Sequence, residues 1–146
     1  MNIFELAVQA YICERPQRFI KPQFSIAHSE NDGSGGSLPD FLVIDFEVKK
    51  IYLVEVTKAD SLSGLMGRLA ERETRWIQPL REYLASLQGG FETWPIHVTA
   101  FVRDENVKSA RNRVGDTAGV SIKSLDEVIF DWRWNWNGGE AINSLE

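Results

Sequence analysis

The sequence predicts an α/β domain in which helices flank a mixed central sheet. Segments with helical periodicity alternate with short runs rich in Val, Ile, Leu and Phe, in the order helix, strand, strand, strand, helix, strand, helix, strand. Hydrophobic residues make up 43% of the 146 residues and charged residues 25%, which is the balance of a globular domain. Neither an internal repeat nor a linker divides the chain, so residues 1–146 are treated as a single domain.

The first part of the chain contains one predicted helix and one predicted strand. Residues 2–14 carry apolar side chains at helical spacing, with Asn2 as the N-cap and Glu5 at the third helical position, as in a capping box. Cys13, the only cysteine, lies within this pattern, and we expect it to be buried. Residues 19–28 alternate loosely in polarity, which is typical of a strand.

Two strands joined by a short turn follow a polar segment. Residues 29–38 are rich in glycine and serine and are expected to form a mobile loop. Residues 40–46 and 51–57 are rich in β-branched and aromatic side chains, and the polar residues between these two runs indicate a hairpin.

One long helix and several shorter elements complete the predicted domain. The long helix begins at Ser61 and ends at Gly89 and Gly90, and Pro79 should kink or restart it. The remaining predicted elements are a strand at residues 96–102, a helix at 105–114, a strand at 120–122 and a helix at 125–130.

Two acidic residues meet at the open end of the predicted hairpin. Asp40 begins the first strand and Glu55 lies near the end of the second, so the two are expected to be neighbours. Because side chains alternate along a strand, Glu55 and Thr57 share one face, whereas Val56 and Lys58 take the other. A hard cation relieves the repulsion between two carboxylates and is typically bound by one or two of them together with substrate phosphate. Solvated acids at strand ends are the alternative interpretation.

The stretch PDFLVIDFEVKKIYLVEVTKAD resembles the core of the PD-(D/E)XK nuclease superfamily, which includes restriction endonucleases, Holliday-junction resolvases and viral cap-snatching endonucleases. The order of elements over residues 2–102 is similar to the αβββαβ restriction-endonuclease-like core. The resemblance implies that Asp40 and Glu55 are catalytic metal ligands and that the Val56 carbonyl assists them. It also implies that Glu5, on the first helix, binds a second Mg²⁺ or Mn²⁺ ion or its water shell.

Thr57 departs from the family pattern, because the family has a lysine two residues after the glutamate. A bulge in the strand could turn Lys58 inward as the catalytic lysine. Alternatively, a basic residue of the following helix could contact the phosphate, and the candidates are Arg68, Arg72 and Arg75, which the spacing places on one helix face. A third interpretation is that catalysis is lost and the fold only binds a protein or nucleic-acid partner.

Other residues carry weaker functional signals. His28, before the polar loop, is a less favoured candidate for a metal ligand or base, and His97 is expected to be structural. Trp132, Trp134 and Trp136 alternate in a C-terminal extension at residues 131–146. Such a row is more typical of a core edge or subunit interface than of a platform for stacking bases.

Charge and composition limit the functional classes. The net charge of −5 argues against non-specific coating of nucleic acid, which depends on many phosphate contacts, but not against a metal-dependent nuclease. No apolar run is long enough for a membrane helix, and one cysteine cannot form an internal disulfide, so we expect a cytoplasmic protein that binds no membrane. The expected activity is phosphodiester hydrolysis in DNA in preference to RNA. Cutting both strands would need two copies, which favours a homodimer.

Overall fold

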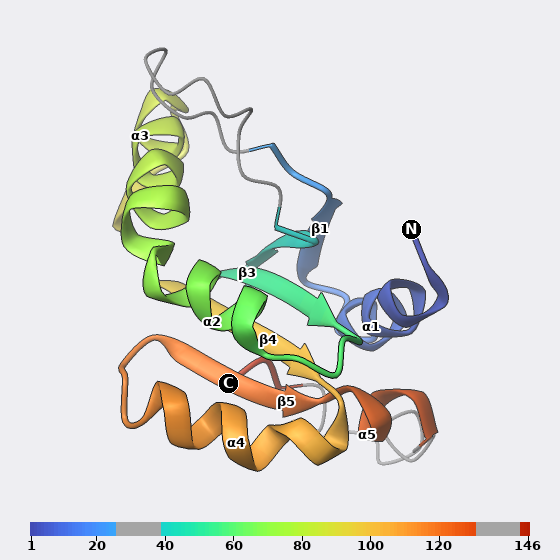
Figure 1. The fold of residues 1–146 in the computed structure, drawn as a ribbon. Helices are drawn as coiled ribbons and strands as arrows, with labels where there is room; N and C mark the ends of the chain where they lie inside the picture. Colours follow the sequence, from blue (N-terminus) through green and yellow to red (C-terminus); the bar gives the residue numbers. More distant parts are fainter. Residues whose placement is uncertain (26–38, 131–143) are drawn as a thin grey trace.

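The predicted α/β class with a mixed sheet is confirmed by the computed structural model, which describes residues 1–25, 39–130 and 144–146 (Figure 1). Within these residues one five-stranded sheet has the strand order β1-β2-β3-β4-β5. The strands are β1 (Arg18–Pro22), β2 (Phe41–Asp45), β3 (Lys50–Thr57), β4 (Ile96–Val102) and β5 (Val120–Ser124). The first three strands pair antiparallel, and β3, β4 and β5 run parallel to one another.

Helices cover both faces of the sheet. The helices are α1 (Ile3–Cys13), α2 (Ser63–Ala70), α3 (Gln78–Ser86), α4 (Asp104–Val114) and α5 (Leu125–Phe130). A π-helical segment, η1 (Glu73–Ile77), joins α2 to α3, and a short 3-10 helix, η2 (Phe91–Thr93), precedes β4. No helix in the described part of the chain is both long and apolar enough to cross a membrane.

Alternation along the strands divides the core into two hydrophobic clusters. Leu42 and Leu53 belong to one cluster, together with buried residues of α2, α3 and α4. Val43 and Val54, one position further along each strand, belong to the other cluster, with residues of α1 and α5. We call these two sides of the sheet the α2 face and the α1 face.

Helix α1 buries a different stripe from the one predicted. Its buried residues are Val8, Tyr11 and Ile12. Ile3 and Leu6 belong to the predicted stripe but are 74% and 54% exposed. The expectation of a buried thiol is also wrong, because Cys13 is exposed. Successive residues are rotated by about 100° around the helix axis. Cys13 is therefore rotated by about 100° from Ile12, away from the buried side of the helix.

The predicted long helix is interrupted near Pro79, as its sequence indicated. Pro79 lies in the first turn of α3, where its missing N–H is tolerated. The wider turn of η1 precedes it and changes the register between α2 and α3. Trp76, in η1, is fully buried and holds this junction against the sheet.

Two predicted segments fall outside the described residues. One is the polar loop at residues 29–38 together with His28, and the other contains Trp132, Trp134 and Trp136. Residues 144–146 are described, and they lie against the α1 face, where Leu145 is buried.

Candidate metal centre

Asp40 and Glu55 lie side by side where the β2–β3 hairpin opens. The pairing of Phe41 with Val54, continued by one residue, sets Asp40 opposite Glu55. The Val56 N–H donates a hydrogen bond of 2.6 Å to Asp40 Oδ2. The hairpin therefore brings together the two acids that the sequence had paired.

Burial raises the pKa of both carboxyl groups. Glu55 is 5% exposed, and its pKa rises to about 7 because of burial and the nearby charge of Asp40. Burial raises the pKa of Asp40 to about 6, although the hydrogen bond from Val56 lowers it, and the negative charge of Glu5 raises it further. The two acids therefore resist ionising together, which is the condition that a bound cation relieves.

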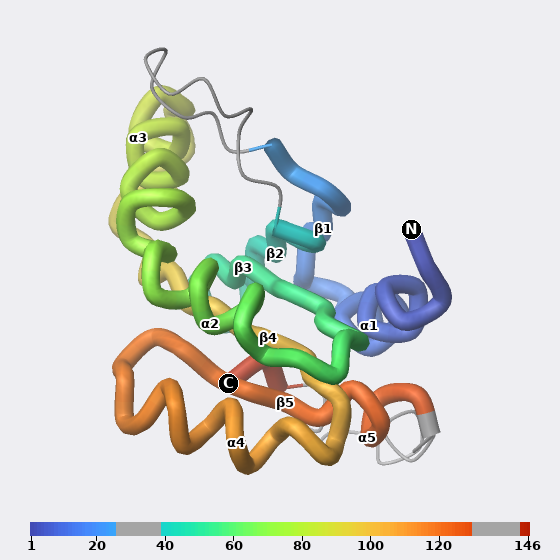
Figure 2. Tube along the Cα trace, viewed as in Figure 1, coloured from blue at the N-terminus to red at the C-terminus, as the bar shows by residue number. Residues whose placement is uncertain are grey.

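Glu5 reaches this end of the sheet from helix α1. The tube view shows α1 beside the end of β3, which it contacts (Figure 2). Glu5 forms the predicted capping box: its N–H donates to Asn2 Oδ1 at 3.0 Å, and its Oε2 accepts from the Asn2 N–H at 3.1 Å. The influence of Glu5 on the pKa of Asp40 brings all three predicted acids into one electrostatic neighbourhood.

The three acids do not form a compact ligand cluster. Within residues 1–25, 39–130 and 144–146, no three His, Cys, Asp or Glu side chains form a group that could hold a metal ion. Glu5 is engaged by its capping box and Glu55 by Arg68, whose Nε lies 3.2 Å from Glu55 Oε2. The donor set still fits a hard cation, because Mg²⁺ commonly takes one or two carboxylates and fills its other positions with water and phosphate.

Lys58 lies on the α1 face, as strand alternation predicted. The pairing of β3 with β4 continues unbroken to Thr57 and Val102, so the proposed bulge is absent. The Lys58 ammonium lies 5.7 Å from the centre of the Phe4 ring on α1. The bulge interpretation is therefore wrong, and the Lys58 ammonium packs over α1 rather than pairing with Glu55.

The three candidate arginines have three different partners. Arg68 pairs with Glu55, whereas Arg75 Nε pairs with Glu71 Oε2 at 2.7 Å. Arg72 Nη1 donates to the Leu69 carbonyl at 2.7 Å. The predicted common face does not persist, because the chain leaves α-helical geometry after α2. Of these three arginines, only Arg68 pairs with a carboxylate of the candidate metal centre.

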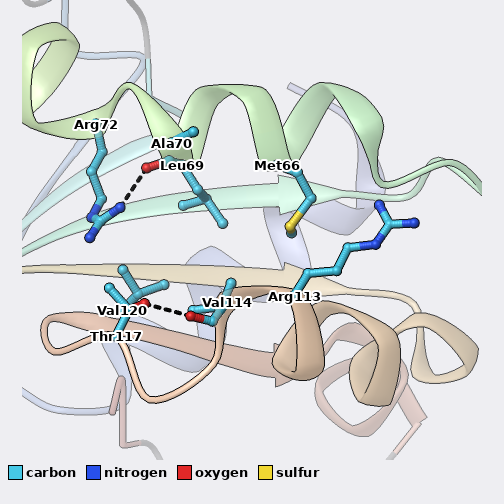
Figure 3. Close-up of a pocket in the computed structure, with 8 residues that line it drawn as sticks. All are labelled: Met66, Leu69, Ala70, Arg72, Arg113, Val114, Thr117 and Val120. Atoms are coloured by element: carbon cyan, nitrogen blue, oxygen red, sulfur yellow. Dashed lines mark hydrogen bonds between the residues drawn. The ribbon is translucent and has the colours of Figure 1, made fainter.

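Arg72 instead lines a pocket of about 260 Å³ between α2 and the α4–β5 region (Figure 3). Figure 3 shows Arg72 and Arg113 at opposite sides of this pocket. Its other lining residues are Met66, Leu69, Ala70, Val114, Thr117 and Val120. Neither Asp40 nor Glu55 lines it, so the pocket is separate from the candidate metal centre.

Lys21 is a basic residue near the carboxylates that the sequence reasoning missed. The Gln23 N–H donates to the Asp40 carbonyl at 2.8 Å, and Lys21 pairs with Leu42. Lys21 therefore lies diagonally across from Asp40 on the same face of the sheet. Diagonal neighbours in an antiparallel pair have Cα atoms about 7–8 Å apart. The alternation of β1 beside the hairpin is the signal that would have identified it.

Comparisons with protein-family models, curated proteins and solved structures found no match.

Proposed function

We propose that the protein is a divalent-metal-dependent nuclease with a restriction-endonuclease-like core. The observation that carries the proposal is the side-by-side placement of the half-buried Asp40 and the buried Glu55, whose pKa values are both raised. The order α1, β1, β2, β3, α2 and β4 supports the proposal, because it is the αβββαβ order of the PD-(D/E)XK nuclease superfamily, which the sequence resembles.

Asp40, Glu55 and the Val56 carbonyl would hold Mg²⁺ or Mn²⁺. The bound metal would activate a water molecule and stabilise negative charge on the phosphate. Glu5 adjoins this group through Asp40 and would bind a second ion or its water shell. The Val56 N–H fixes the Asp40 carboxylate, so the ligand pair is oriented before any cation arrives.

Arg68 is the residue best placed to contact the phosphate. Its guanidinium neutralises Glu55, and its side chain is 36% exposed, so it has access to solvent and substrate. Arginine stays protonated and cannot act as a general base. A cation that replaces Arg68 at Glu55 would leave the guanidinium free to bind an oxygen of the phosphate.

Cleavage assays test this proposal directly. We expect plasmid DNA or single-stranded substrates to be cut in Mg²⁺ or Mn²⁺ and not in EDTA. Asp40→Asn and Glu55→Gln should each reduce the rate by at least about 100-fold, because each removes a charge that holds the metal. Glu105→Gln, an exposed acid on α4, is the matched control and should cut like the wild type. Equal cleavage by all four proteins would contradict the proposal.

The second candidate function is an inactive nuclease-fold module that binds a protein or nucleic-acid partner. It is favoured by Thr57 in the lysine position and by the ion pair between Arg68 and Glu55. Calorimetric titration with Mn²⁺ separates the two candidates. Binding that is lost in Asp40→Asn supports an active centre, whereas neither binding nor cleavage supports the inactive module.

A further inference from the structure

Strand β1 has one covered face and one open face. On the α1 face, Arg18 Nε bonds Asp45 Oδ2 at 2.9 Å, and Ile20 packs against the cluster that contains Val43. Phe19 and Lys21 alternate with these residues and are exposed on the α2 face, Phe19 to 55%. In Figure 1, α2 passes in front of β3 and β4, and β1 lies beyond it with no labelled helix in front.

The two exposed side chains lie on a line that leads away from the candidate metal centre. Lys21 pairs with Leu42 and Phe19 pairs with Ile44, two and four residues along β2 from Asp40. At about 3.3 Å per residue, Phe19 lies about 13 Å along the sheet from the level of Asp40. Along this side of the sheet, Asp40 at the candidate metal centre is followed by the exposed Lys21 and then by the exposed Phe19.

In the part of the chain that the structure describes, the Phe19 ring packs against no other aromatic ring and the Lys21 ammonium forms no ion pair. Phe46 is also exposed, to 46%, but its ring packs against Phe91 and Trp94 at 5.9 and 5.7 Å. Phe19 makes no comparable ring contact with another described residue, and Lys21 makes no ion pair with one. A single exposed apolar side chain is ordinary on a protein surface, but here the ring stands beside a cation on the strand next to the candidate metal centre.

We propose that the open face of β1, formed by Phe19 and Lys21, binds single-stranded nucleic acid. The proposal builds on the nuclease function above, which sets the scissile phosphate at Asp40 and Glu55. Lys21 supplies a charge for the neighbouring phosphate, and Phe19 offers a ring on which an unpaired base stacks. Because the bases of a duplex are already stacked, this geometry selects an unpaired strand or end.

Fluorescence anisotropy tests the proposal with the full chain, a labelled 12-nucleotide single strand and the matching duplex, all in EDTA. Phe19→Leu keeps an apolar side chain but removes the ring, and it should weaken single-strand binding by about 5- to 100-fold. Phe19→Tyr should restore binding. Lys21→Gln should weaken binding and reduce its salt dependence, because a phosphate contact is lost.

Val48→Ala and Lys49→Gln are the matched controls. Both residues are exposed in the β2–β3 turn, at the opposite end of the hairpin from Asp40, and their variants should bind like the wild type. Thermal unfolding should show all variants folded, since every altered side chain is exposed.

The outcomes separate this surface from the nuclease function. Duplex binding as tight as single-strand binding, or unchanged binding by Phe19→Leu, would overturn the surface proposal even if Asp40→Asn abolishes cleavage. Absence of cleavage, combined with Phe19-dependent binding of the single strand, would refute the nuclease and support the surface. Binding of a protein partner without any oligonucleotide binding would also overturn it.

Discussion

At the scale of single residues, the carboxyl groups of Asp40 and Glu55 lie where burial disfavours their charged forms. One cation, Arg68, compensates Glu55 at 3.2 Å, while Asp40 relies on the Val56 N–H. Two ionised carboxylates with one arginine leave a net negative charge in a mostly buried position. A divalent cation removes that charge, so the site should favour metal most strongly once both acids are ionised.

Without divalent metal, stability should fall as pH rises from about 4.5 to about 7. The pKa of Glu55 in the folded protein is about 7, above its ordinary value of 4.5. Folded protein therefore holds a proton that unfolded chain releases, and the associated stability is lost as pH rises through this window. Glu55→Gln has no such proton to lose, so at pH 8 it should be more stable than the wild type.

Urea unfolding in EDTA at pH 5 and pH 8 measures this difference. Glu105→Gln changes an exposed acid on α4 and should show no gain that depends on pH. A Glu55→Gln variant less stable than the wild type at pH 8 would contradict the electrostatic account.

At the scale of elements, the N-terminus of α1 connects helix capping with the candidate metal centre. The same Glu5 side chain caps the helix through Asn2 and acts on Asp40 through its charge. The cap thus holds an acid near the β2–β3 hairpin.

Asn2→Ala should cost about 1 kcal/mol of stability, because it removes the side-chain acceptor of the capping box. It should also weaken Mn²⁺ binding less than Asp40→Asn does, since Glu5 is only loosened. Chemical denaturation and calorimetry provide the two measurements. Asn112→Ala, at an exposed position of α4, is the control, and an equal stability loss there would argue against a specific cap.

At the scale of the whole molecule, the two faces of the sheet differ in how they are covered and in which residues they carry. The α2 face holds the carboxylates and leaves β1 open, whereas the α1 face is closed by α1, α5 and residues 144–146. Leu145 is 1% exposed there, and its carbonyl accepts a hydrogen bond from the Thr99 hydroxyl. The Tyr11 hydroxyl donates to the Ser144 carbonyl at 3.1 Å.

Leu145→Ala should reduce the free energy of unfolding by about 2–5 kcal/mol, because it leaves a cavity beneath the sheet. Leu87→Ala, at a residue 40% exposed, should have a much smaller effect. Denaturant titration measures both values, and similar losses for the two variants would show that residues 144–146 do not close the core.

Local patterns were sufficient for part of this protein. The alternation of the hairpin strands and the short turn between them predicted that Asp40 meets Glu55 and that Lys58 points away. The hairpin that places these three residues spans about twenty residues, so their relative positions depend on local strand pairing and not on contacts with distant parts of the chain. The restart of the helix at Pro79 was predictable for the same reason.

Packing between distant segments decided the rest. Helix α1 carries apolar residues on more than one side, so only its docking determined that Tyr11 is buried and Cys13 is exposed. The pairing of Arg68 with Glu55 depends on where α2 crosses β3. The open face at Phe19 exists because the helices of the α2 face do not extend over β1, and periodicity alone does not show which sheet face a helix leaves uncovered.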